Sequence, residues 1–421
     1  IGVFFILYLG FGITFEYILK MPMGFYNIPI VVTFLAAILV ASLQNKKLSF
    51  DEKLVLMGQG IGDKNIVTMI LIFLEAGIFV GVVGRESAES VAYFMLSVIP
   101  PQFAVAVLFV VGCFVSLAMG TSVGTITLLT PIAVAVSNAS GFDMALCVAS
   151  VMGGAMFGDN LSFISDTTIA ATRTQGCSMR DKFRTNVAIV APAAVITLLI
   201  YIFSSEQTIS YAATAIDSPW YTMIPYLLVL VMAAAGVNVL KVLVAGILSS
   251  GLIGICCGKV SVLEWFSTMG QGIDSMGQLI IITMMAGGML EMIRINGGIN
   301  YLISLLTSRL SSRRGAEASI ATLVVVADIC TANNTVAIIS VGSIACDIGQ
   351  RFGIAPRRVA SLLDTFSCFI QGLLPYGAQL LMAAGLAAIS PVEIIRYLYY
   401  PVIMGLCAAV AILVQRPRCN D

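Results

Sequence analysis

The sequence predicts an all-α polytopic membrane protein with two inverted repeats of about five transmembrane helices, each carrying a re-entrant hairpin and a broken helix. Three observations predict this class. First, 59% of the 421 residues are hydrophobic and only 10% are charged, against roughly 25% charged in soluble domains. Second, one motif recurs half a chain later. Third, apolar segments are interrupted at matched positions. Soluble enzymes, nucleic-acid binders and disordered scaffolds are therefore excluded.

The composition also limits the chemistry. Basic and acidic residues number 22 each, so no polyelectrolyte partner such as nucleic acid is indicated. The chain has no histidine, which excludes imidazole metal sites and imidazole proton relays. Its cysteines are scattered apart from the adjacent Cys256 and Cys257, which give neither metal-ligand spacing nor a disulfide framework. We therefore expect no enzyme and no resident cofactor.

An internal repeat spans the chain. The pentapeptide Met-Gly-Gln-Gly-Ile at 57–61 recurs at 269–273, an offset of 212, and downstream the offset settles at 213. This predicts a duplication, with repeat 1 over 1–206 and repeat 2 over 207–421. The glycines of the motif are not preceded by a strand and lack a P-loop lysine. They therefore suit a glycine-containing interfacial helix better than a nucleotide loop.

Hydropathy gives each repeat the same series of elements. Apolar runs long enough to cross a bilayer are membrane helices, and the amphipathic stretches suit arms along the interface. The predicted elements of repeat 1 are helices 1–19, 28–43 and 65–84, an amphipathic stretch 86–99, a hairpin 102–138, a broken helix 142–172 and a plain helix 187–203. Those of repeat 2 are helices 222–237, 240–257 and 277–293, an amphipathic stretch 297–310, a hairpin 318–348, a broken helix 357–389 and a helix 397–414.

Five crossings per repeat would insert the second repeat upside down relative to the first. The positive charges give an independent check. Under this topology most of the 22 basic residues lie on one side, which the positive-inside rule makes cytoplasmic. We therefore predict a multi-pass protein of the cell membrane, surrounded by the lipid bilayer, with its basic loops in the cytoplasm. The residues on the other side are Lys20, Arg85, Lys259 and Arg396.

The first broken helix carries the richest polar stretch, at 158–168. Its two carboxylates, Asp159 and Asp166, have no basic residue near them between 144 and 172. A carboxylate at membrane depth is costly, and matched helix breaks in two repeats mark transporter binding sites. The other candidate ligands here are Asn160, Ser162, Ser165 and Thr167. The structural alternative is a solvated loop in which Asp caps a helix.

The remaining breaks are uncharged. In the second broken helix, at 371–379, Gln379 aligns with Asp166. The hairpin tips add Thr121, Ser122, Thr125, Asn333, Asn334 and Thr335, whose simpler role is backbone capping. The weaker candidates are three acids with a possible structural role: Asp328, Asp364 and Glu75. Glu291 with Arg294 fits an interfacial pair, and the basic runs at 173–184 and 309–314 fit orientation signals.

The stretch at 158–168, with Asp159, Ser162, Ser165, Asp166 and Thr167, resembles the signature of the NhaC-type Na+/H+ antiporter family. The hairpin and broken-helix repeat is similar to the wider ion-transporter superfamily. The resemblance implies roles for those five residues, a homodimer, and a mobile transport part that moves as an elevator on a scaffold. It leaves the cargo open, since some members exchange malate for lactate and others move amino acids.

The residue chemistry suits a hard monovalent cation, because carboxylate, hydroxyl and amide groups all offer oxygen. Our leading hypothesis is secondary transport in which Na+ and H+ compete for Asp166, with Asp159 as the second carboxylate and Ser162 and Ser165 as further Na+ ligands. The alternative is a Na+-coupled carrier or exchanger of a small organic solute. The four breaks contain no Lys or Arg, which disfavours an organic anion but leaves an amino acid open. A channel fits the duplicated breaks less well.

Overall fold

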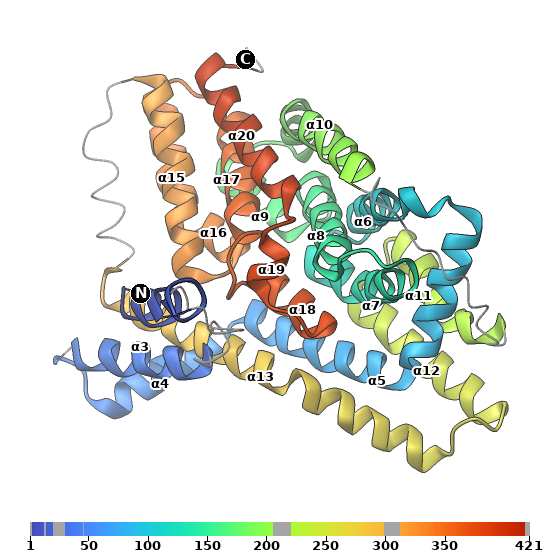
Figure 1. Ribbon diagram of the computed structural model, residues 1–421. Coiled ribbons are helices and arrows are strands. Elements are labelled where there is room, and N and C mark those ends of the chain that lie inside the picture. The colour runs from blue at the N-terminus through green and yellow to red at the C-terminus, as the bar shows by residue number, and fades with distance from the viewer. Residues whose placement is uncertain are drawn as a thin grey trace.

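The computed structural model describes residues 2–11, 14–19, 30–44, 46–204, 220–298 and 312–416. Within these ranges the chain forms helices and no strand (Figure 1), which confirms the all-α class. Six of the described helices are long and apolar enough to cross a membrane. The predicted amphipathic stretch 297–310 lies outside the described residues apart from 297 and 298.

Two capping boxes mark equivalent helix starts in the two halves. Ser49 accepts from the backbone of Glu52 at the start of α4 (Phe50–Ile61), and Ser261 does the same with Glu264 at the start of α13 (Val262–Ile295). The downstream course differs. In the first half α4 ends and α5 (Lys64–Val98) follows, whereas α13 continues as one helix. The predicted start at 277 is therefore wrong, because α13 begins at Val262 and includes the second copy of the motif, at 269–273.

The predicted helix 65–84 and amphipathic stretch 86–99 are joined in α5, with a kink at Gly84, whose φ is +69°. Beyond the kink, Ser87 donates to the backbone carbonyl of Thr222, and Ala88 and Ala92 are buried. This stretch therefore packs on the short helix η5 (Trp220–Met223). Before α4 the chain forms α1 (Gly2–Phe5), the π-helical turns η1 (Ile6–Gly10) and η2 (Thr14–Ile18), and α3 (Ile30–Gln44).

Helix pairs joined by short breaks cover 104–140, 144–175, 313–351 and 356–387, the regions in which the sequence predicts the hairpins and broken helices. The elements of the first half are α6 (Ala104–Met119), α7 (Ser122–Ser140), α8 (Met144–Leu161), α9 (Asp166–Gln175) and α10 (Met179–Ser204). The elements of the second half are α11 (Ile224–Ala234), α12 (Val239–Cys256), α13, α15 (Arg313–Thr331), α16 (Asn334–Arg351), α17 (Pro356–Gln371), α18 (Ala378–Ala387), α19 (Pro391–Ile395) and α20 (Tyr399–Val414). The helix α10 begins at Met179, whereas the sequence predicts its start at 187.

The two hairpins pack reciprocally. The second arm of the first hairpin, α7, contacts α18, and the second arm of the second hairpin, α16, contacts α9. Each hairpin thus meets the broken helix of the other half (Figure 1). This exchange of partners is what two symmetry-related repeats would give. Their opposite insertion in the membrane stays a prediction.

Glycines bring α13 directly onto α4 and α5. A Cβ at Gly60 would lie 2.3 Å from the carbonyl oxygen of Gly287, and a Cβ at Gly77 would lie 2.3 Å from that of Gly272. Only glycine allows such an approach. Figure 1 shows α5 and α13 running side by side below the hairpins and broken helices. We call α4, α5, α12 and α13 the long-helix layer, and α6–α9 with α15–α18 the break-bearing group.

Candidate functional site

The two hairpin tips are built by similar backbone geometry. The first turns at Gly120, whose φ is +69°, and Thr121 then caps α7 by accepting from the amide of Gly124 at 3.3 Å. The second turns at Ala332, with φ of +49°, and Asn333 caps α16 by accepting from the amide of Val336 at 3.0 Å. The capping role considered for the tip residues is therefore realised at Thr121 and Asn333.

Asp159 lies at the centre of the first break, and only 5% of its surface is exposed. Ser122, at the first hairpin tip, donates to its Oδ2 at 2.7 Å, and Ser165 donates to its Oδ1 at 2.5 Å. The hydroxyls of Ser165 and Thr167 lie 2.8 Å apart. Asp159 forms no ion pair with a Lys or Arg of the described chain. Hydroxyl oxygens, rather than a cation, therefore surround this buried carboxylate.

A chain of hydrogen bonds joins this centre to the second half. The side-chain amide of Gln379, on α18, donates to Ser122 Oγ at 3.2 Å, and Gln371 donates to Gln379 Oε1 at 2.7 Å. Gln371 also donates to the carbonyl of Ala332 at the second tip, at 3.2 Å. Both breaks and the first hairpin tip thus meet in one polar network, which reaches the second tip through the backbone carbonyl of Ala332.

Two helix N-termini also face Asp159. Its partners Ser122 and Ser165 lie at the starts of α7 and α9. The free N–H groups of a helix start carry partial positive charge and favour an anion. The site therefore suits an ionised carboxylate, and with its hydroxyl and amide oxygens it also suits a hard cation bound to that carboxylate.

Asp166 differs from the leading expectation. It is the first residue of α9, and its side chain is exposed, whereas Asp159 is buried. The sequence identified both carboxylates but could not tell which of them faces the enclosed network. The hydroxyl of Ser162 does not bond to Asp159. It donates to the carbonyl of Leu117 at 2.9 Å and so links the end of α8 to α6. Thr125 donates to the carbonyl of Thr121, one turn earlier in α7.

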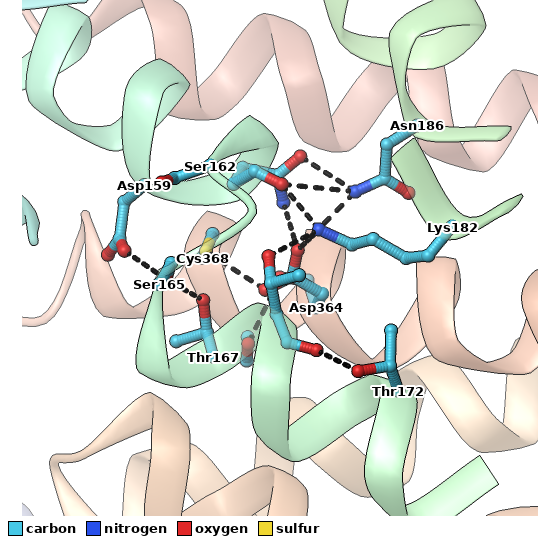
Figure 2. Close-up of polar contacts among 12 residues, drawn as sticks. Asp159, Ser162, Ser165, Thr167, Thr172, Lys182, Asn186, Asp364 and Cys368 are labelled. Carbon is cyan, nitrogen blue, oxygen red and sulfur yellow. Dashed lines mark hydrogen bonds and ion pairs between the residues drawn. The ribbon is translucent and has the colours of Figure 1, made fainter. Parts of the chain in front are cut away.

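A second polar cluster lies beside the first (Figure 2). The sequence pointed to its members Asn160 and Asp364 but not to Lys182 and Asn186. Lys182, assigned above to an orientation signal, is buried and forms an ion pair with Asp364 of α17. Its ammonium also donates to the backbone carbonyl of Asn160 and, at 2.9 Å, to the Thr168 hydroxyl. The amide of Asn160 in turn donates to Asp364 at 3.1 Å. In Figure 2, Asp159 points away from this cluster toward Ser165.

A signal for Lys182 existed in the sequence. Lys182 and Asn186 are spaced by one helical turn from each other and from the buried apolar positions Ile189, Val190 and Ala193. Beginning that helix at 187 left Lys182 in a loop. Because α10 begins at Met179, this spacing turns the lysine toward the interior.

The other predicted acids lie apart from these clusters. Asp328 on α15 is fully buried, and Glu75 on α5 is half-buried with one buried oxygen that lacks a partner in the described chain. Near the second tip, Asn334 is buried while Thr335 is half-buried. A cavity of about 20 Å³, large enough for one water or ion, separates this tip from the long-helix layer. Its polar lining residues include Thr283, Thr331, Asn333 and Tyr376.

Two further charge pairs are structural. Glu291 and Arg294 lie 3.6 Å apart on α13, as expected. Arg358 was counted among the cytoplasmic charges, but its side chain is buried and lies 3.0 Å from Glu317. It also donates to the carbonyl of Arg416. This pair fastens α15, α17 and the residues just after α20 together, at the opposite end of α17 from the break at 371–379.

Comparisons with known proteins identify the family of this chain. A model of the Na+/H+ antiporter family matches residues 25–206 and, a second time, residues 204–415. The chain belongs to the Na+/H+ antiporter family. The family consists of transporters. A match in each half also fits the internal duplication.

Individual relatives cover nearly the whole chain. It is 27% identical to the Na+/H+ antiporter NhaC of Alkalihalophilus pseudofirmus, over 95% of this chain and 91% of that protein. It is 21% identical to a malate-2H+/Na+-lactate antiporter of Bacillus subtilis, over 95% and 90%. Among solved structures, the Alcanivorax borkumensis YdaH transporter matches with a TM-score of 0.46 and 13% identity, over 91% of this chain and 97% of that one.

Proposed function

We propose that this antiporter exchanges Na+ for H+ at the Asp159 centre. The observation that carries the proposal is a buried carboxylate whose partners are the hydroxyls of Ser122 and Ser165, at the starts of two helices. Hard cations take oxygen ligands of these kinds. Membership of the Na+/H+ antiporter family supports the identity of the ions.

Competition for one carboxylate couples the two ions. With a proton on Asp159 the centre is neutral, and with Na+ bound it is neutral again. The bare carboxylate leaves a net charge at membrane depth, which costs several kcal/mol. Only the two loaded forms then cross the membrane. When Na+ binds, the hydroxyls of Ser122 and Ser165 rotate to turn a lone pair, instead of a proton, toward the centre.

Asp166 has a different part in this proposal. It remains a candidate ligand, but its side chain is exposed, so in this proposal its carboxylate stays hydrated. A second negative charge near the centre raises the local concentration of cations. Asp166 therefore attracts and guides Na+ toward the enclosed Asp159, and the protonation step takes place at Asp159.

The proposed alternating access uses the two groups of helices as its moving and fixed parts. The break-bearing group holds the whole polar network, from Asp159 through Gln379 to Ala332. The long-helix layer is fastened within itself by the contacts of Gly60 and Gly77. In our proposal the first group moves as a unit along the second, in an elevator, and the layer also supports a homodimer.

Exchange of organic acids is the second candidate, because of the similarity to a malate-2H+/Na+-lactate antiporter. The charges at the first break favour the inorganic cation. The ammonium closest to that break belongs to Lys182, which is already paired with Asp364 and enclosed by the chain. It is therefore not free to neutralise a substrate carboxylate.

The test is a transport assay with the purified protein in proteoliposomes that enclose a pH-sensitive dye. Inward gradients of Na+, Li+ and K+ are compared with gradients of malate, lactate and a panel of amino acids. We expect proton efflux driven by Na+ in the absence of any organic solute. Proton movement that requires malate or lactate would replace the proposal with the organic exchanger.

A further inference from the structure

The cluster around Lys182 has the composition of a cation site. We propose that the Lys182 ammonium permanently occupies a second cation-binding site beside the transport centre, and that removing it lets Na+ bind there. The choice of Na+ as the probe ion rests on the function proposed above. The site itself is argued from the contacts of Lys182 with Asp364, Asn160 and Thr168.

The ammonium is surrounded by oxygen. Its partners are a carboxylate from Asp364, a backbone carbonyl from Asn160 and a hydroxyl from Thr168. Proteins assemble these three oxygen types around hard metal cations. The Lys182 and Asp364 side chains are 1% and 0% exposed. The shell is therefore closed to bulk water, and without the ammonium its carboxylate would lack a counter-charge.

The shell is also positioned by the helix break rather than by Lys182 alone. The Asn160 carbonyl lies near the end of α8, where helical hydrogen bonding stops, and Thr168 lies in the first turn of α9. The Asn160 amide is held between Asp364, to which it donates at 3.1 Å, and Asn186, which donates to Asn160 Oδ1 at 2.9 Å. These bonds do not involve the ammonium, so they keep Asp364 and Asn160 in place when it is removed.

A permanently filled second site sets the charge of the cycle. Lys182 neutralises Asp364, whereas the neighbouring Asp159 has hydroxyl partners. Of these two neighbouring buried carboxylates, Asp159 is then the one open to ions that come and go. Lys182 is thus a specificity-determining residue that limits the number of Na+ ions carried, since with Lys182 in place the Asp364 shell cannot accept a mobile cation.

A purely structural ion pair would behave differently, and three variants separate the two readings. Lys182→Met keeps most of the side-chain length and removes the charge. Lys182→Met combined with Asp364→Asn removes both charges and leaves no anionic ligand. Arg184→Met is the matched control, because Arg184 is an exposed basic residue on the same helix.

The measurement is the number of Na+ ions bound per full-length chain, from equilibrium binding of radioactive Na+ to purified protein. We expect one more Na+ per chain in Lys182→Met than in the wild type, and no such increase in the double variant or in Arg184→Met. An unchanged number of bound ions in a folded Lys182→Met protein would overturn the proposal.

Folding supplies a second readout if Lys182→Met is unstable. The proposal predicts that this variant is recovered as a monodisperse protein from Na+ medium but not from choline medium, while the double variant is recovered from both. Loss of Lys182→Met in both media, with the double variant intact, would show that Na+ cannot replace the ammonium. That outcome would also overturn the proposal.

A further variant keeps this proposal separate from the transport function. Asp159→Asn combined with Lys182→Met is expected to retain the additional Na+ and to lose the ion bound at the transport centre. If the wild type binds no Na+ while Lys182→Met gains one, the inference stands and the function proposed above fails. If Asp159→Asn abolishes the ion gained in Lys182→Met, the second site is not independent and the inference fails.

Discussion

The two broken helices share a backbone plan and differ in chemistry. The break between α8 and α9 holds the buried Asp159, and the break between α17 and α18 holds the neutral Gln371 and Gln379. At the offset of 213, Gly372 takes the place of Asp159 and Gln379 that of Asp166. The paired breaks of the two halves thus build one enclosed site, and in the proposed mechanism the exchangeable carboxylate lies in the first half. The second copy supplies neutral hydrogen bonds that hold the first hairpin tip.

The sharpest way to break this comparison is to neutralise each carboxylate of the first break. We expect Asp159→Asn to reduce Na+-driven proton flux in proteoliposomes to the level of empty liposomes, because the shared binding group is lost. Asp166→Asn is the matched control, and should retain measurable exchange with a raised KM for Na+. Exchange that survives in Asp159→Asn and disappears in Asp166→Asn would move the site to Asp166.

The second half does contain a buried charge pair, but away from its break. Arg358→Met removes the 3.0 Å partner of the buried Glu317 and leaves Arg313, at 3.8 Å, to pair with it, so we expect a loss of at most about 3–5 kcal/mol in the free energy of unfolding. Thermal unfolding of the purified protein measures it. Adding Glu317→Gln should restore most of the loss. A stable Arg358→Met protein that lacks transport would instead give this pair a functional role.

The hairpin tips offer a comparison at one backbone position. Gly120 and Ala332 both have positive φ, and a Cβ at Gly120 would lie 2.6 Å from the Ile164 side chain. Gly120→Ala should therefore lower the free energy of unfolding by at least about 1–2 kcal/mol, the cost of the left-handed conformation. Ala332→Gly should leave stability unchanged or raise it slightly. If the loss of stability in Gly120→Ala is no larger than the gain in Ala332→Gly, the contact with Ile164 adds nothing, and this explanation is contradicted.

The smallest expected effect concerns the neutral bridge between the halves. Gln379→Leu removes the hydrogen bond that Gln379 accepts from Gln371 and the one that it donates to Ser122 Oγ. The second of these positions a partner of Asp159 and is worth about 1 kcal/mol. We expect the KM for Na+ to rise about fivefold, with the maximal rate nearly unchanged, as measured by initial proton flux. A total loss of transport in a folded variant would show that Gln379 binds the ion itself.

Much of this arrangement follows from local patterns in the sequence. The breaks at 120–125, 158–168 and 371–379 were predictable because polar residues interrupt apolar runs, and Ser122, Ser165 and Gln379 do join the Asp159 network. Which of these polar side chains face the enclosed site is not a local property, because it depends on how α7 and α18 pack.

The misses share one physical cause, the exact point at which a helix begins or ends. The apolar run of α10 starts only at 187 and therefore predicts a loop at Lys182. The helix in fact begins at Met179. Likewise α13 runs on where its counterpart stops at Ile61 and restarts at Lys64. Polar residues at such ends are stabilised by tertiary contacts, which hydropathy does not record.

The central claim is that Na+ and H+ share the Asp159 carboxylate, and the pH dependence of Na+ kinetics tests it most directly. A protonated carboxylate cannot bind Na+, so the account predicts that in the acidic range the KM for Na+ rises, by up to about tenfold for each unit of falling pH, at a constant maximal rate. A constant KM with a falling maximal rate would mean that the two ions bind at separate groups, and would contradict it.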